Sequence, residues 1–150
     1  MKKCFAMLVM VGLVSGLSLN AFAHKQLNDK FLEVYGSPES KDTSDKFKTL
    51  AKEAKCNLCH ILGENKKKRN PFGSVLHDEI EAGKFPLKEF IVDLKKDPKS
   101  TKHDDALKAI FKKVVEQKAG STDKTFAERM KADELPGGDK EGKGLPAAAK

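Results

Sequence analysis

The chain has 150 residues, with 29 Lys and Arg against 22 Asp and Glu, and a formal net charge of +7. The charge is spread along the chain and does not by itself indicate nucleic-acid binding, and no uncharged run beyond the N-terminus is long enough to span a membrane. The length is sufficient for one domain with a modest core.

Residues 1–23 have the pattern of a secretory signal peptide. Two lysines precede an uncharged run from residue 5 to residue 19, and the small residues Ala21 and Ala23 permit cleavage after Ala23. A retained membrane anchor is the alternative, because the uncharged span is nearly long enough to cross a bilayer. Cleavage leaves 27 basic and 22 acidic residues. We therefore expect a periplasmic or otherwise extracytoplasmic protein with no membrane span after cleavage and no nucleic-acid partner.

Residues 24–42 are polar and contain Gly36 and Pro38, which predicts a short helical turn followed by a loop. From Thr43 the pattern changes, and apolar residues recur at i, i+3, i+4 and i+7. These residues are Phe47, Leu50, Ala51 and Ala54. The spacing predicts an amphipathic helix that is capped by Thr43 or Ser44 and leads directly into Cys56.

The same spacing predicts further helices. One covers Phe72 to Glu81, the next has Pro86 in its first turn, and a third runs from about Thr101 to Lys118. Ser121 or Thr122 is expected to cap a last helix. No segment alternates as a strand does, so the fold class is all-α.

The segment from residue 136 to residue 150 contains four glycines and two prolines. This composition predicts a flexible tail.

Cys56, Cys59 and His60 form the pattern C-x-x-C-H. A disulfide between these cysteines would close too small a loop to stabilise a fold. The pair therefore indicates a functional role, such as redox activity, metal binding or cofactor attachment. A thioredoxin-like redox pair needs a strand-to-helix junction, and a structural zinc site needs four ligands. Attachment of c-type haem needs only the three residues present, with two thioethers and a proximal histidine. The pattern therefore predicts one covalent haem c, in agreement with export.

The stretch KFKTLAKEAKCNLCHILGENKKKRNPFG resembles the opening of a small monohaem c-type cytochrome, with a helix, the attachment motif and a loop with an Asn-Pro turn. The resemblance covers about residues 43–80. It implies a class I-like haem domain over residues 43–135 that transfers electrons and has no enzymatic activity. In class I members a later methionine is the second axial ligand and a C-terminal helix packs across the N-terminal one, where this chain has a glycine-rich segment.

Four other residues are candidates for the sixth position of the iron: His24, His77, His103 and Met130. Met130 is the predicted distal ligand, because it lies on the apolar side of the last predicted helix. His103 falls on the apolar side of its helix but in the first turn. His77 falls about 125° from the centre of its helix's apolar face and is expected to point to solvent. His24 lies in the polar segment.

The run Lys66, Lys67, Lys68 and Arg69 follows the motif closely. It predicts either a basic rim that attracts an acidic redox partner or a solvated loop. A peroxidase would need acid–base groups such as a His-Arg pair, and no such pair is recognisable near the motif in the sequence. The expected function is electron transfer, and the alternative is a haem-based gas-binding or sensor protein with an open sixth position.

Overall fold

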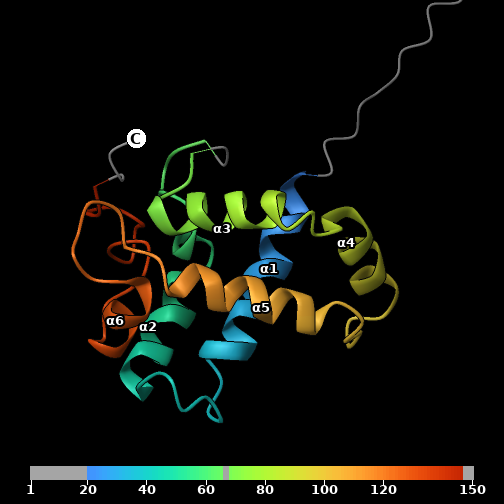
Figure 1. Ribbon diagram of the computed structural model, residues 1–150, viewed down its shortest axis with the longest axis horizontal. Coiled ribbons are helices and arrows are strands. Elements are labelled where there is room, and N and C mark those ends of the chain that lie inside the picture. The colour runs from blue at the N-terminus through green and yellow to red at the C-terminus, as the bar shows by residue number, and fades with distance from the viewer. Residues whose placement is uncertain (1–19, 66–67, 147–150) are drawn as a thin grey trace, which may run out of the picture.

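The computed structural model describes residues 20–65 and 68–146. Within these ranges the chain forms six α-helices, one 3₁₀ turn and no strand, which confirms the prediction of an all-α fold. Figure 1 shows α3 and α5 crossing in front of α1, with α4 at one end and α2 and α6 at the other. The helices are α1 (Asn20–Tyr35), α2 (Asp45–Ala54), α3 (Pro71–Ala82), α4 (Leu87–Lys96), α5 (Asp104–Val115) and α6 (Phe126–Lys131).

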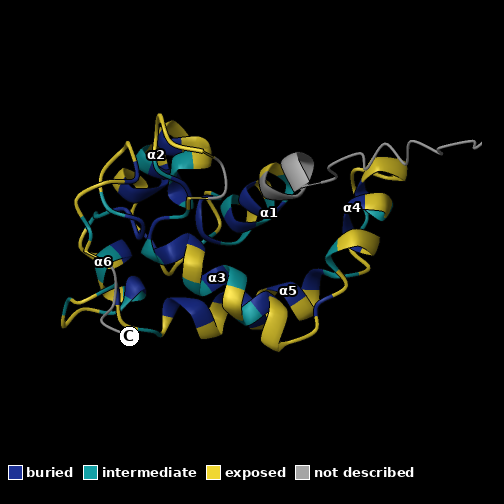
Figure 2. Cartoon of the chain, turned by 90° about the horizontal axis from the view of Figure 1, so that it is seen from above, coloured by how far each residue is buried: buried dark blue, intermediate teal, exposed yellow. Residues whose placement is uncertain are grey.

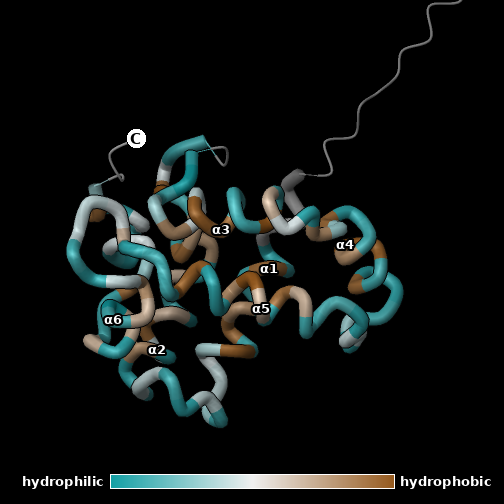
Figure 3. The backbone as a smooth tube through the Cα atoms, viewed as in Figure 1, coloured by the Kyte–Doolittle hydropathy of each residue, from teal (hydrophilic) through white to brown (hydrophobic). Residues whose placement is uncertain are grey.

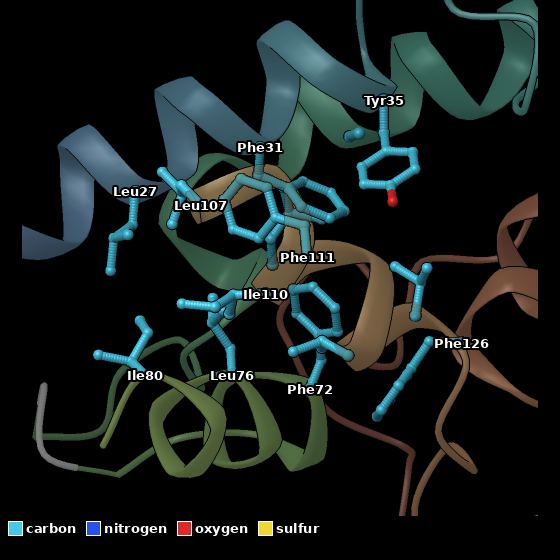
Figure 4. Packing of buried hydrophobic residues seen from close by; sticks show 14 of the residues in the cluster. Leu27, Phe31, Tyr35, Phe72, Leu76, Ile80, Leu107, Ile110, Phe111 and Phe126 are labelled. Carbon is cyan, nitrogen blue, oxygen red and sulfur yellow. The ribbon is translucent and has the colours of Figure 1, made fainter. Parts of the chain in front are cut away.

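Aromatic side chains from four helices form the centre of the core (Figure 4). Phe31 of α1 contacts Phe72 of α3 and Phe111 of α5, with ring centroids 5.2 and 5.4 Å apart. Phe126 of α6 reaches the other side of Phe72, at 5.2 Å. These pairs are edge-on, an arrangement that aromatic rings favour. The hydropathy of the chain agrees with this position of the core. Helices α3 and α5 carry recurrent hydrophobic residues, while the turn between α4 and α5 is hydrophilic (Figure 3).

The helices predicted after Thr43 are all present, with differences at their ends. Ser44 caps α2 by accepting a hydrogen bond from the Phe47 N–H at 3.1 Å. The helix α5 is shorter than predicted at both ends. The cap of α6 is Thr125, because Thr125 and Glu128 exchange reciprocal hydrogen bonds in a capping box.

The N-terminal polar segment differs most from its prediction. A short turn was expected between residues 24 and 42, but α1 continues to Tyr35. Leu27, Phe31 and Tyr35 are only 5%, 2% and 7% exposed. They form one narrow stripe at i, i+4 and i+8, with the partly buried Leu32 and Val34 beside it. Figure 2 shows both buried and exposed residues on α1, and Figure 4 shows Leu27, Phe31 and Tyr35 pointing from α1 toward the other core side chains. Helix α1 is therefore part of the domain, and its contacts with α2 and α4 support it.

The predicted signal segment lies outside the described residues, except that its last four residues begin α1. Among the residues that the structure describes, no helix has the length and apolar character needed to cross a membrane.

Candidate functional site

The C-x-x-C-H motif begins in the 3₁₀ turn η1 (Lys55–Leu58), directly after α2. Helix α2 ends because Lys55 has a positive φ of 50°. The Cys56 carbonyl then accepts hydrogen bonds from the N–H groups of Cys59 at 3.2 Å and His60 at 3.1 Å. This tight turn lets all three motif side chains line the same pocket.

His60 is buried, with 8% of its surface exposed. Its Nδ1 lies 3.3 Å from the Lys68 carbonyl oxygen, and residues 60 and 69 face each other in an antiparallel bridge. An imidazole whose Nδ1–H donates to a backbone carbonyl has its lone pair on Nε2, the usual arrangement of a metal-ligating histidine. The backbone therefore orients His60 as a ligand would be oriented.

The two cysteines are not joined by a disulfide, and Cys56 is exposed while Cys59 is half-buried. Burial, with a smaller effect of Cys56, raises the pKa of the Cys59 thiol to about 12. Reactive redox cysteines have lowered thiol pKa values, since the thiolate is the attacking species. Cys59 is therefore unsuited to be the attacking thiol of a redox pair. A thioredoxin-like site is disfavoured for another reason, because no strand precedes the motif in the part of the chain that the structure describes.

The pocket beside the motif lies between α1, α3 and α4 and contains about 500 Å³ of space, part of it open to solvent. Its apolar lining comes from all three helices: Leu27, Leu76, Ile80 and Leu87. The polar side chains in the lining outside the motif are Asn28, Arg69 and His77. Asn28 is 8% exposed, and its Oδ1 has no hydrogen-bond partner. A mostly apolar pocket with a few convergent polar groups is typical of a cofactor site.

The four candidates for the sixth position lie in different places. Met130 is 2% exposed within the core and does not line the motif pocket. His103 lies at the start of α5, where its Nε2 is 2.9 Å from Asp93 Oδ2, and it also does not line that pocket. The side chain of His24 is outside the described part of the chain. His77 lines the pocket together with the motif.

His77 was expected to point to solvent, but its side chain is only 33% exposed. The expectation counted apolar residues alone. The pocket side of α3 is formed by Gly73, Leu76, His77 and Ile80, at i, i+3, i+4 and i+7. A glycine and a histidine add nothing to an apolar pattern, so this second face of α3 was not visible in the sequence.

Two residues that sequence reasoning missed fix α3 against the motif. Asn70 is fully buried, and its Oδ1 accepts from the Gly73 N–H at 2.9 Å. Its Nδ2 donates to the carbonyls of Asn57 and Leu58, both at 3.0 Å. A Cβ at Gly73 would lie 2.1 Å from the Cys59 carbonyl oxygen. Only glycine therefore permits this approach of α3 to the motif. In the sequence, the Asn-Pro pair at residues 70 and 71 was the one signal that could have predicted Asn70 as the N-cap of α3.

The glycine-rich C-terminal segment also lies against the motif, although its composition predicted a flexible tail. The Leu62 N–H donates to the Glu141 carbonyl at 2.7 Å, and Asn57 Nδ2 donates to the Lys140 carbonyl at 3.0 Å. Gly142 is buried, and a Cβ there would lie 2.0 Å from the His60 carbonyl oxygen. The segment up to residue 146 thus makes specific backbone contacts, for which glycines are required rather than disruptive.

The basic run is only partly visible, since Lys66 and Lys67 are outside the described residues. Lys68 is exposed and pairs with Glu64 at 3.2 Å, whereas Arg69 lines the motif pocket. Of the two described residues of the run, Lys68 therefore lies on the surface and Arg69 lies in the candidate site.

Among the side chains that the structure describes, no group of three or more His, Cys, Asp or Glu is arranged to hold a metal ion. Comparisons with protein-family models, with curated proteins and with solved structures find no match. Fold and site together define a small all-α chain with a C-x-x-C-H motif in an apolar pocket.

Proposed function

We propose that the chain holds one covalent haem c and acts as an exported monohaem electron carrier. The observation that carries this proposal is the position of Cys56, Cys59 and His60. All three line one apolar pocket, and the Lys68 carbonyl holds the imidazole through Nδ1.

The pocket suits an amphipathic macrocycle that bears carboxylates. Its lining is mainly apolar, as is usual for cofactor sites. Arg69 supplies a cation beside Cys59, and Asn28 supplies an amide whose Oδ1 lacks a partner. An amide turned by 180° exchanges its acceptor oxygen for an NH₂ donor, which could bind a carboxylate.

The motif residues would hold the haem in the way that the C-x-x-C-H pattern implies. Cys56 and Cys59 would form thioethers as each S–H adds across a vinyl group, and His60 Nε2 would be the proximal ligand. The bound iron supplies one-electron redox chemistry. The protein's own contribution is to hold His60 in one orientation and to surround the site with aliphatic side chains that limit access of water.

Export and partner choice belong to the same proposal. The N-terminal pattern would direct the chain out of the cytoplasm. This agrees with the proposal, because c-type haem is attached outside the cytoplasm. The basic residues Lys66, Lys67, Lys68 and Arg69 would favour an acidic redox partner, because opposite charges raise the rate of encounter at low salt.

Denaturing gels of the protein produced with a cytochrome maturation system test the proposal. We expect peroxidase staining by haem at the position of the chain, and no loss of that stain after extraction with acid acetone. Cys56→Ser with Cys59→Ser should abolish the stain, and each single variant should retain one thioether. The control is Cys4→Ser, which changes only the segment expected to be removed. Complete extraction of haem from the unaltered chain would refute the proposal.

A further inference from the structure

The sixth position of the iron is the open question for the proposed site, and the pocket lining bears on it. Of the candidate side chains that the structure describes, His77 alone lines the pocket with Cys56, Cys59 and His60. Met130 is enclosed in the core, and His103 is held by Asp93 and lies against the rings of Phe85 and Phe90.

The position of His77 along α3 is suited to reaching a group bound beside the motif. Gly73 lies against the Cys59 carbonyl, and His77 follows four residues later on the same side of the helix. At about 1.5 Å per residue, one turn places His77 roughly 6 Å further along the helix axis. His77 therefore lies about one helical turn from the point where α3 meets the motif, and both line the pocket in which the ring would lie.

The present contacts of His77 allow this role. Its Nε2 lies 3.3 Å from Glu81 Oε1, and its Nδ1 lies 3.5 Å from Asp78 Oδ1. Both carboxylates are largely exposed, at 67% and 81%, so these pairs are weak and easily exchanged. Ligation through Nε2 would displace Glu81 and leave Nδ1–H facing Asp78, the carboxylate–histidine arrangement that orients metal ligands.

From this geometry we infer that His77 is the distal ligand of the iron, which gives two axial histidines in place of the predicted His60–Met130 pair. The inference rests on the proposed function. It favours an electron carrier over a gas-binding protein, because a sixth protein ligand occupies the position that a gas would need. Two histidines also give a lower reduction potential than a histidine and a methionine.

Absorption spectra of the holoprotein test the inference. The unaltered protein should be low-spin, should lack the near-infrared band of a sulfur–iron(III) bond and should resist carbon monoxide. His77→Ala should keep its covalent haem, become high-spin and take up carbon monoxide, and added imidazole should restore the low-spin spectrum. His77→Met should stay low-spin, gain the sulfur band and have a higher reduction potential. His103→Ala and Met130→Leu are matched controls and should leave the unaltered spectrum in place.

Several results would overturn the inference. One is an unchanged low-spin spectrum in His77→Ala, and a second is a sulfur band in the unaltered protein that Met130→Leu removes. A third is a high-spin spectrum in His24→Ala with a normal spectrum in His77→Ala. Retention of covalent haem in all variants would leave the proposed function intact in each of these cases. Absence of covalent haem from the unaltered protein would refute both.

Discussion

Asn70 is the residue whose removal should most clearly loosen the motif. Its side chain is fully buried and makes three hydrogen bonds of 2.9 to 3.0 Å. One caps α3, and loss of such a cap costs about 1 kcal/mol. The other two satisfy the carbonyls of Asn57, which is half-buried, and Leu58, which is buried. Each of these acceptors left without its partner costs about 1 kcal/mol more. Asn70→Ala should therefore lower the free energy of unfolding by about 3 kcal/mol.

A second substitution separates the two contributions. Asn70→Ser keeps a hydroxyl oxygen that can cap α3 but cannot reach both motif carbonyls, so its cost should be about 2 kcal/mol. Urea unfolding of the purified mature protein measures both values, provided that the slope of the transition stays unchanged. Ser74→Ala, at an exposed position in the first turns of α3, is the control and should change stability by less than about 0.5 kcal/mol. If both Asn70 variants lose less than about 1 kcal/mol, the reasoning is wrong.

Three further predictions concern contacts around the domain. Gly142→Ala should reduce stability and the yield of holoprotein because its Cβ would meet the carbonyl of the motif histidine. Gly144→Ala is matched, since both glycines have positive φ (73° and 83°) but Gly144 has nothing within 4 Å; equal losses would contradict the contact. Lys30→Met should cost about 3 kcal/mol in urea unfolding, because it leaves the buried carboxylate of Asp104 without its cation at 2.8 Å. Adding Asp104→Leu should recover most of that loss, and no recovery would contradict the account. Hydrogen bonds from a neighbouring lysine and histidine hold the pKa of Asp93 below its ordinary value of 3.8. Its contribution to stability is therefore present above 3.8 and lost as the pH falls through the folded-state value. Asp93→Asn should flatten the acid side of the plot of urea midpoint against pH, and an unchanged plot would count against it.

The sequence predicted the helices wherever a strong apolar pattern decides the structure. In α2 and α4 apolar residues recur on one face, and burial of that face determines the helix. Helix α1 was underestimated because its buried stripe has only one residue per turn. Its length depends on contacts with α2 and α4, which no local pattern contains.

The sequence singled out three residues that the structure brings to one pocket, but it did not reveal their surroundings. The motif itself identified Cys56, Cys59 and His60. The pocket side of α3 and the approach of residues 136–146 depend on glycine and asparagine, whose value lies in small size or in hydrogen bonds to distant backbone. Gly142 illustrates this, since its position against the His60 carbonyl joins segments 82 residues apart. Composition indicated a flexible tail there, because it registers the absence of apolar side chains but no backbone contact.

The mass of the intact purified protein is the most direct test of covalent haem. The account predicts the mass of the chain from His24 to Lys150 plus one haem, since two thioether additions neither add nor remove other atoms. The same mass should remain after denaturation and acid acetone extraction. A chain that carries no added haem mass after production with a maturation system would contradict the central claim.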